Sequence, residues 1–356
     1  MKRYGNLYEK IYDMENLKLA HKNAKRGKGW YKEVKMVDEN PEYYLTLLQE
    51  QLVNKTYHTS EYETFIKNDN GKEREIYKLP YFPDRICQWA IIQVIEPILI
   101  KRLTINTYSA IPKRGIHFGL KRLKNDLRKD PEGCKYCLKL DIKKYYPSIN
   151  HTILKEQYSK LFKDRDLLWL LYEIIDSTNG DTGIPIGNYL SQYSGNFYLS
   201  SFDHWIKESK NVEYYHRYMD DIVILKSTKS ELQQLKNEIE NYLSDNLKLS
   251  IKDNWQVFPT NTRGIDFLGY RIFIKFILLR NSICKRFKIK MNKIEYKISN
   301  GVMMNYSEWC SVNSYKGWII HCNAFRLYQK YIIPLLPYTD FYYKTFIKER
   351  EDFNYA

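Results

Sequence analysis

Two adjacent aspartates stand within a strongly apolar stretch of the sequence. Asp220 and Asp221 follow Tyr218-Met219 and precede the run Ile222-Val223-Ile224-Leu225. Carboxylates this close raise each other's pKa, so the pair is costly unless a cation neutralises it. A divalent metal ion would do so, and metal-assisted phosphoryl transfer needs carboxylates placed in this way. For an isolated Asp-Asp pair an exposed turn would be the favoured interpretation, but the apolar flanks on both sides and a matching aspartate, Asp141, favour a metal site.

A third aspartate can complete this set. Asp141 ends the alternating segment Cys137-Leu138-Lys139-Leu140-Asp141, a pattern typical of a strand that delivers a carboxylate at its end. Magnesium takes only a few carboxylates beside substrate phosphates and water. Two ions about 3.5–4 Å apart hold the attacking and leaving oxygens of a phosphoryl transfer, and three aspartates suffice for them. We therefore expect Asp141, Asp220 and Asp221 to form one catalytic site.

The surrounding pattern predicts the elements that position these aspartates. A strand at 137–141 precedes a helix at 188–205, two short strands around a tight turn at 214–225, a helix through Leu232, Leu235, Ile239 and Leu243, and a strand at 247–251. This order is typical of an α+β layer, with helices on one face of an antiparallel sheet.

The flanking regions are predicted to be mainly helical. The first 70 residues indicate polar helices with a basic glycine loop at 25–29, followed by strand-like runs at 63–66 and 74–77 around the turn Asn68–Gly71. A helix is expected from Asp84 to Glu96, ending at Pro97. Beyond residue 270 the chain is expected to be helical and basic, because residues 271–297 carry nine Lys or Arg and a single acid, Glu295.

Composition is compatible with a polyanionic partner. The chain has 356 residues and a net charge of +15, and 15% of its residues are aromatic. Cations release counterions from phosphates, and rings stack on bases, so both features suit nucleic acid; a basic protein without such a partner is the alternative. The N-terminus lacks the apolar run of a signal peptide, and the apolar stretch at 89–100 is too short to span a bilayer, so we expect a soluble, cytoplasmic protein without a membrane partner.

Two segments resemble motifs of bacterial reverse transcriptases. Residues 140–149 are similar to their motif A and residues 218–221 to their motif C. The resemblance implies that Asp141 and Asp220 bind both of two Mg²⁺ ions, for which Mn²⁺ could substitute, that the backbone carbonyl of Ile142 is a further ligand, and that Asp221 supports the site. It also implies an α+β right-hand polymerase, with fingers at 1–136, a palm of antiparallel sheet backed by helices at 137–270, and a helical thumb at 271–356.

Further residues receive roles from the same resemblance. Tyr146 falls where the family places an aromatic ring that excludes a 2′-hydroxyl, with core packing beside Pro147 as the alternative. Arg74 and Lys78 fall in a fingers motif that reaches the triphosphate of the incoming dNTP. Contacts to template or primer are implied for a further set: Arg85, Arg114, Tyr218, Gly269, Lys316 and Trp318. For Arg85, an ion pair with Asp84 or another neighbour stays open.

Motif B separates this chain from most reverse transcriptases. Where they show Gln-Gly-x-x-x-Ser-Pro, this chain has Ile186, Gly187 and, at the proline position, Gln192. Gly187 is expected to allow close approach of the backbone to the nascent base pair, and all three residues are assigned to the nucleotide site. The combination resembles diversity-generating retroelements, whose enzymes miscopy template adenines; neutral drift of an ordinary enzyme is the alternative.

This subtype implies particular partners. They are a template RNA, the cDNA or RNA–DNA duplex, dNTPs and a pentameric basic accessory protein. Reverse transcriptases of phage-defence or group II intron-derived systems are the second hypothesis, although group II intron enzymes normally continue past the thumb and this sequence ends at Ala356. A third hypothesis is an RNA-binding protein on a polymerase fold, which the presence of all three aspartates disfavours.

Overall fold

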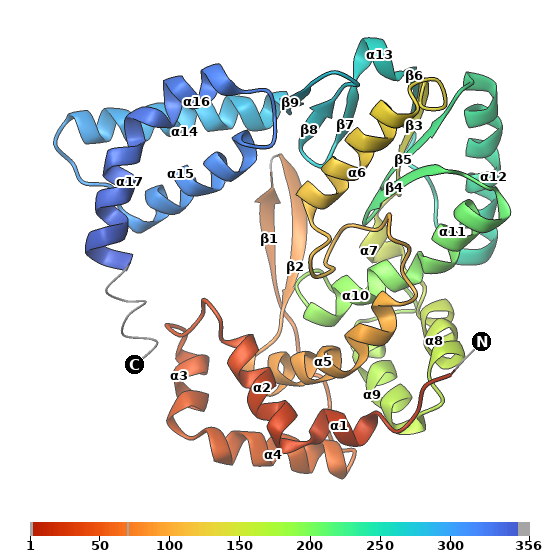
Figure 1. Cartoon of the computed structure of the whole chain (residues 1–356). Helices are drawn as coiled ribbons and strands as arrows, with labels where there is room; N and C mark the ends of the chain where they lie inside the picture. The colour runs from red at the N-terminus through yellow and green to blue at the C-terminus, as the bar shows by residue number, and fades with distance from the viewer. Residues whose placement is uncertain (1–2, 70, 348–356) are drawn as a thin grey trace. The chain divides into compact units, whose positions relative to one another are not determined.

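The computed structural model describes residues 3–69 and 71–347 (Figure 1). Contacts group the chain into two compact units, which are described separately. Unit 1 consists of Met1–Gly115, Lys139–Ile224 and Gln233–Gln256, and unit 2 of Ile116–Leu138, Leu225–Leu232 and Val257–Ala356. The fingers, palm and thumb boundaries remain a prediction.

Five helices form the N-terminal part of unit 1, with α2 and α1 packed on α5. They are α1 (Tyr8–Tyr12), α2 (Met14–Ala24), α3 (Lys32–Glu39), α4 (Pro41–Val53) and α5 (Ile86–Ile100). The Asp13 side chain caps α2 by accepting from two backbone N–H groups of its first turn. The expected end of the last helix at Pro97 is wrong, because α5 runs through it. Burial of Ile98 and Leu99 offsets the hydrogen bond that proline cannot donate.

A long hairpin follows α4. Strands β1 (Glu63–Asp69) and β2 (Lys72–Lys78) pair antiparallel, with Phe65 opposite Ile76. This confirms the two predicted strands. The turn between them includes Asn70, which lies outside the described residues; the Gly71 N–H donates to Asn68 Oδ1 at 2.9 Å.

The central sheet has four strands in the order β4-β5-β3-β6. These are β3 (Tyr136–Asp141), β4 (Tyr214–Tyr218), β5 (Asp221–Lys226) and β6 (Gln256–Pro259). The predicted strand at 137–141 and the predicted hairpin are confirmed, and Cys137 is fully buried in β3. The strand expected at 247–251 is wrong, since only Ile251 makes a single bridge, to Ile142. Lys248 has a φ of 53°, which interrupts an extended backbone there.

Short and medium helices complete unit 1. They are α7 (Tyr145–Ser148), α8 (His151–Leu161), α9 (Arg165–Asp176), α10 (Tyr189–Tyr198), α11 (Ser200–His204) and α12 (Lys229–Leu247), whose first residues belong to unit 2. The predicted helix at 188–205 is therefore divided between α10 and α11. The ring of Phe202 in α11 contacts Tyr215 of β4 and Tyr242 of α12, so these helices cover part of the sheet.

Unit 2 combines one long and one short helix, a small sheet and a C-terminal helical bundle. Its elements are α6 (Ile116–Lys129), α13 (Thr260–Arg263), the antiparallel sheet β7 (Ile265–Phe267), β8 (Tyr270–Ile272) and β9 (Ile277–Leu279), and α14 (Asn281–Ser299), α15 (Tyr306–Ile319), α16 (Phe325–Tyr331) and α17 (Leu336–Tyr342). The bundle packs around Phe287, Met291 and Val312. The expectation of a helix directly after residue 270 is wrong, because β8 and β9 precede α14.

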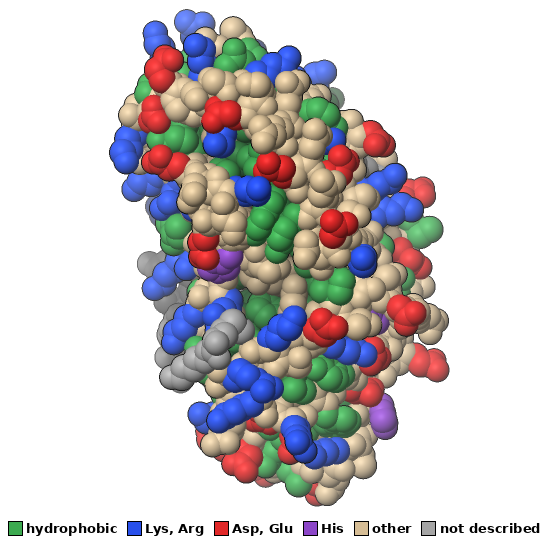
Figure 2. Space-filling view, turned by 90° about the vertical axis from the view of Figure 1, so that its right-hand side faces the viewer, with side chains coloured by type: hydrophobic (Ala, Val, Ile, Leu, Met, Phe, Trp, Pro, Cys, Tyr) green, Lys and Arg blue, Asp and Glu red, His purple; other side chains and the backbone are tan. Residues whose placement is uncertain are grey.

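The predicted α+β class, with antiparallel strands and helices, is confirmed. On the face drawn in Figure 2, Lys and Arg side chains are intermixed with Asp and Glu. Among the described residues, no helix combines the length and the apolar character that crossing a bilayer requires.

Candidate active site

A tight turn between β4 and β5 carries two of the three predicted aspartates. Met219, at the tip, adopts a φ of 54°, a conformation that non-glycine residues rarely hold. The backbone carbonyl of Asp220 accepts a hydrogen bond from the N–H of Ile142 at 3.2 Å, which ties the turn to the end of β3. Asp141 is the last residue of β3, so the structure brings Asp141 and Asp220 together.

The Asp220 carboxyl lies in an environment that disfavours its charge. Burial, followed by the nearby Asp141 carboxylate, raises the pKa of Asp220 to about 6. Bound cations relieve such a pair. The donor set of two adjacent carboxyls therefore fits a divalent metal ion.

Two lysines accompany the aspartates. The Lys252 ammonium pairs with Asp141 Oδ1, and Lys139 Nζ lies 2.7 Å from Asp221 Oδ1. Asp221 begins β5, where its side chain meets Lys139 of β3. Within residues 3–69 and 71–347, no three His, Cys, Asp or Glu side chains are spaced as a metal-binding group. The joint role of all three aspartates remains a prediction.

A buried arginine holds the turn from behind, and it was missed at the sequence level. Arg217 in β4 is fully buried and donates from Nη1 to the Met219 carbonyl at 3.1 Å. Its guanidinium is bidentate with Asp203 of α11 at 2.7 and 2.6 Å. The signal was an arginine in the middle of a predicted strand, since a charge that becomes buried needs a partner.

Tyr146 lies beside the aspartate turn. Its hydroxyl donates to Met219 Sδ at 3.8 Å. Burial raises the pKa of Tyr146, the charge of Asp220 raises it further, and the Arg74 guanidinium acts in the opposite direction. Tyr146, Asp220 and Arg74 therefore share one electrostatic environment, and Tyr218 contributes to it.

The motif B segment pairs with β2. The Tyr77 N–H donates to the Ile186 carbonyl at 2.9 Å. A Cβ on Gly187, whose φ is 131°, would lie 2.3 Å from the Tyr77 carbonyl oxygen. Glycine is thus required here by the protein's own backbone, a reason that sequence reasoning missed.

A cavity of about 170 Å³ opens at this junction. It is lined by Phe65, Ile76, Tyr77, Lys78, Leu79, Arg85, Gln88, Gly187, Asn188 and Tyr189. Lys78, Arg85 and Gly187 are thus brought together, although Lys78 Nζ also pairs with Glu63 at 2.8 Å. Gln192 lies on an exposed position of α10 and does not line the cavity.

Two further arginines, predicted to contact template or primer, make hydrogen bonds to backbone carbonyls. Arg85 Nε donates to the Ala24 carbonyl at 3.4 Å, whereas Asp84 accepts from Tyr57 and Ser60. The alternative of an Arg85–Asp84 ion pair is therefore wrong. Arg114 Nη1 donates to the Thr104 carbonyl at 3.2 Å.

Three predicted contact residues belong to unit 2. Gly269 lies in the β7–β8 turn with a φ of 82°, and a Cβ there would lie 2.4 Å from the Trp318 ring. Tyr270 donates to the Trp318 carbonyl at 2.9 Å. Lys316 lies on the same helix, α15. Gly269 therefore packs directly against the Trp318 ring.

Comparison with known proteins assigns the family. A family described as "Reverse transcriptase (RNA-dependent DNA polymerase)" matches residues 66–272, which is more than half of the chain. The chain belongs to the reverse transcriptase family. The matched segment contains the aspartate turn, Tyr146 and motif B, and reverse transcriptases in general use divalent metal ions. Family membership and the α+β architecture agree with the polymerase fold predicted from the motifs.

Relatives of this reverse transcriptase are distant. Protein YkfC of Escherichia coli K12 is 24% identical over 273 residues, covering 65% of this chain and 71% of YkfC. The group II intron-encoded protein LtrA of Lactococcus lactis subsp. cremoris is 20% identical over 307 residues, covering 67% of this chain and 49% of LtrA. This chain thus spans about half the length of that relative.

Solved structures include two similar telomerases. Apo telomerase from Candida tropicalis matches with a TM-score of 0.46 and 13% identity, covering 65% of this chain and 52% of the telomerase chain. Telomerase from Candida albicans, in complex with a TWJ fragment of telomeric RNA, matches with a TM-score of 0.47 and 12% identity over 70% and 50% of the two chains.

Proposed function

We propose that this reverse transcriptase copies an RNA template into DNA by metal-assisted nucleotidyl transfer at Asp141 and Asp220. The observation that carries the proposal is the placement of Asp220 beside Asp141, where the Ile142 N–H ties the turn to the end of β3 and burial raises the pKa of Asp220 to about 6. Asp220 in the turn and Asp141 at the end of β3 are two carboxylates that repel each other, and a bound divalent cation removes that repulsion. Family membership supplies the reaction class.

The proposed residue roles follow the site's geometry. Asp141 and Asp220 hold the metal ions, with the Ile142 carbonyl as a further ligand and Asp221 in support through its contact with Lys139. Mg²⁺, or Mn²⁺ in its place, would supply charge stabilisation at the reacting phosphate. Tyr146 bounds the sugar site beside Met219.

The substrate contacts are proposed for the remaining residues. Arg74 and Lys78 approach the triphosphate of the incoming dNTP, with Arg74 close enough to Tyr146 to affect its pKa. Ile186, Gly187 and Gln192 belong to the motif B segment at the templating pair. The proposed template and primer contacts are Arg85, Arg114, Tyr218, Gly269, Lys316 and Trp318.

The finer proposal is a diversity-generating retroelement enzyme that makes adenine-mutagenised cDNA. It is supported by Ile186 and Gln192 at positions where most reverse transcriptases carry Gln and Pro. The Ile186 carbonyl accepts from the Tyr77 N–H, and its aliphatic side chain has no group that could hydrogen-bond to a base. The subtype also implies a template-repeat RNA and a pentameric basic accessory protein as partners.

Primer extension on a defined RNA template tests the reaction. Native protein with Mg²⁺ and dNTPs should yield cDNA, and Asp220→Ala should abolish it. Asp245→Ala is the matched control, because Asp245 is an exposed carboxylate on α12. Absence of synthesis even with the cognate RNA and accessory protein would leave a nucleic-acid-binding protein on a polymerase fold.

Sequencing of the cDNA tests the subtype. Errors concentrated opposite template adenine support the retroelement, and Ile186→Gln should reduce them. Faithful cDNA from the native enzyme would instead favour a phage-defence or group II intron-derived reverse transcriptase.

A further inference from the structure

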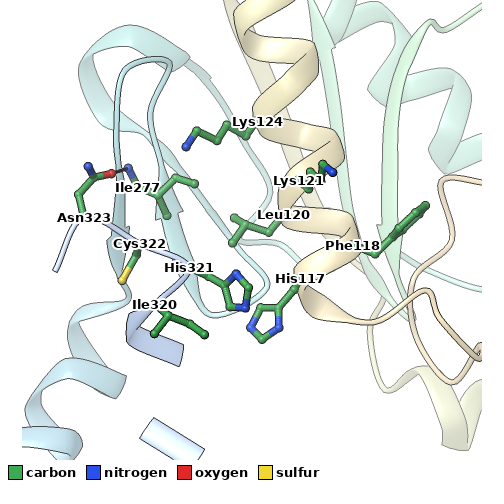
Figure 3. A pocket seen from close by; sticks show the side chains of 10 residues that line it. All are labelled: His117, Phe118, Leu120, Lys121, Lys124, Ile277, Ile320, His321, Cys322 and Asn323. Carbon is green, nitrogen blue, oxygen red and sulfur yellow. Dashed lines mark hydrogen bonds between the residues drawn. The ribbon is translucent and has the colours of Figure 1, made fainter. Parts of the chain in front are cut away.

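A separate cavity of about 590 Å³ lies within unit 2. Asp141, Asp220 and Asp221 are not among its lining residues. Figure 3 shows its walls: α6 on one side, β9 and the turn after α15 on the other. Its volume is in the range of small-ligand sites, about 300–1,000 Å³. None of its lining residues was assigned a role from the sequence.

The lining is basic and contains no acid. Lys121 and Lys124 come from α6, one helical turn apart, and His117 precedes them on the same helix. His321 faces His117 from the opposite wall (Figure 3). Among the described residues, neither lysine makes an ion pair or a side-chain hydrogen bond. Cations left without carboxylates around one cavity create a positive potential that an anion can neutralise.

The wall opposite α6 is held rigidly. The Asn323 N–H donates to the Ile277 carbonyl at 2.8 Å, and the Ile277 N–H donates to Asn323 Oδ1 at 2.9 Å (Figure 3). This reciprocal pair fixes the turn after α15 to β9. A preformed wall lowers the ordering cost of binding.

The two imidazoles are stacked and oriented. The ring centroids of His117 and His321 are 3.7 Å apart, with an interplanar angle of 29°. Tyr270 donates its hydroxyl proton to the Trp318 carbonyl at 2.9 Å, so its oxygen accepts from His117 Nε2 at 3.2 Å. The neutral His117 ring therefore carries its proton on Nε2. On protonation Nδ1 becomes a second donor.

We propose that this cavity binds a phosphate group of a nucleic-acid strand, with Lys121 and Lys124 as its cationic ligands and the His117–His321 pair as ligands that gain a donor on protonation. Leu120, Ile277 and Ile320 supply an apolar wall for the attached sugar or base. A chain with a net charge of +15 in a family that copies nucleic acid meets strand phosphates as its main anions. The choice of a strand phosphate as the anion rests on the proposed function, whereas the anion site itself does not.

Strand binding is measured by fluorescence anisotropy with a labelled single-stranded RNA oligonucleotide. The test variant is Lys121→Gln/Lys124→Gln. The control is Arg128→Gln/Lys129→Gln, which removes the same charge from exposed positions of the same helix outside the cavity. All proteins also carry Asp220→Ala, so the result does not depend on polymerase activity.

Loss of this phosphate contact lowers the slope of log K against log salt by roughly 0.7, which weakens binding by roughly 5-fold at about 0.1 M salt. The control should change binding by much less. Equal weakening in both double variants would overturn the site, because the effect would then be that of net charge alone.

Inorganic phosphate is the second probe, followed by NMR of the histidine side chains, with His321→Asn to assign its resonance. We expect millimolar phosphate to shift His117 and His321 in the parent protein and not in Lys121→Gln/Lys124→Gln. Absence of a shift in the parent overturns the cavity as an anion site. A shift without any difference in RNA affinity overturns the strand assignment and leaves a site for a small anion.

The phosphate-induced shift should grow as pH falls, because protonated imidazoles are donors only. Burial, followed by the charge of His321, lowers the pKa of His117, so its response should appear below the pH at which an exposed imidazole titrates. The charged or titratable groups around the pair are Lys121 and Lys124 of α6, Tyr270 of β8 and Cys322 of the turn.

Discussion

Arg217 and Asp203 form a fully buried, bidentate ion pair directly behind the aspartate turn. The pair links α11 to β4, and the remaining guanidinium nitrogen binds the carbonyl of Met219, next to Asp220. This one ion pair therefore has two structural roles. It neutralises a charge inside the core, and it fixes the backbone next to Asp220, whose carboxylate is proposed to be catalytic.

Removing one partner should unfold the region. Arg217→Met leaves Asp203 charged and buried, and a lone buried charge of this kind costs roughly 3–5 kcal/mol. Urea denaturation of the single variant should show this loss. The double variant Arg217→Met/Asp203→Leu removes both charges and should recover most of the stability.

Activity should separate from stability in the double variant. The Met219 carbonyl has then lost its donor, so primer extension should stay at least tenfold below native although the protein is folded. Recovery of activity together with stability would mean that the arginine matters for folding alone.

The raised pKa of Asp220 predicts a link between metal, pH and stability. The folded pKa of about 6 lies above the ordinary value of 3.8, so the contribution of this group to stability is complete below pH 3.8 and is lost as pH rises through 6. At pH 7.5 the metal-free protein therefore carries an unfavourable charge. Asp220→Asn should raise its Tm by roughly 2–4 °C.

Adding Mg²⁺ should have the complementary effect. It should raise the Tm of the native protein at pH 7.5, less so at pH 5, and leave Asp220→Asn nearly unchanged. The control is Asp245→Asn, which removes an exposed carboxylate from α12. Its Tm should rise with Mg²⁺ as much as that of the native protein. An equal Mg²⁺ response in Asp220→Asn would place the metal elsewhere.

The proposed sugar site at Tyr146 predicts a change in substrate choice when this residue is replaced. Tyr146→Ala should admit ribonucleotides, lowering discrimination against them by roughly 10- to 100-fold, the effect of one steric contact. Tyr146→Phe is the matched control, since it keeps the ring and removes only the hydroxyl that meets Met219. Single-nucleotide incorporation of rNTP against dNTP measures this, and equal discrimination in all three enzymes would contradict a steric gate.

The local elements of the site could be predicted from the sequence because neighbouring residues determine them. The alternation of apolar and polar residues at 137–141 predicted β3, and the Asp-Asp pair with its flanking residues predicted the turn between β4 and β5. The same logic failed at 247–251. Leu249 and Ile251 are buried there although the segment forms no strand. An alternating pattern indicates which side chains are buried, but it does not show that the backbone pairs with a neighbouring strand.

The parts that could not be predicted depend on residues far apart in the chain. The partner of Arg217 is Asp203, on a different element, and no periodicity links them. The cavity of unit 2 joins α6 to a turn some 200 residues later. Pro97 stays helical because the surrounding core buries the residues after it, which overrides the local preference.

Gly187 gives a prediction that depends on this kind of distant contact. Gly187→Ala places a Cβ 2.3 Å from the Tyr77 carbonyl oxygen in a backbone of φ 131°. Conformational strain costs about 1–3 kcal/mol, and overpacking costs about as much again. The pairing of Tyr77 with Ile186 should therefore break, and primer extension and Tm should both fall.

Gly180→Ala separates the two costs. Gly180 also has a positive φ, of 91°, but a Cβ there meets nothing within 4 Å. It should lose only roughly 1–2 kcal/mol for the backbone conformation and keep its polymerase activity. Native-like activity in Gly187→Ala would mean that β2 can move away from motif B, and that the glycine serves the substrate instead of the protein's own backbone.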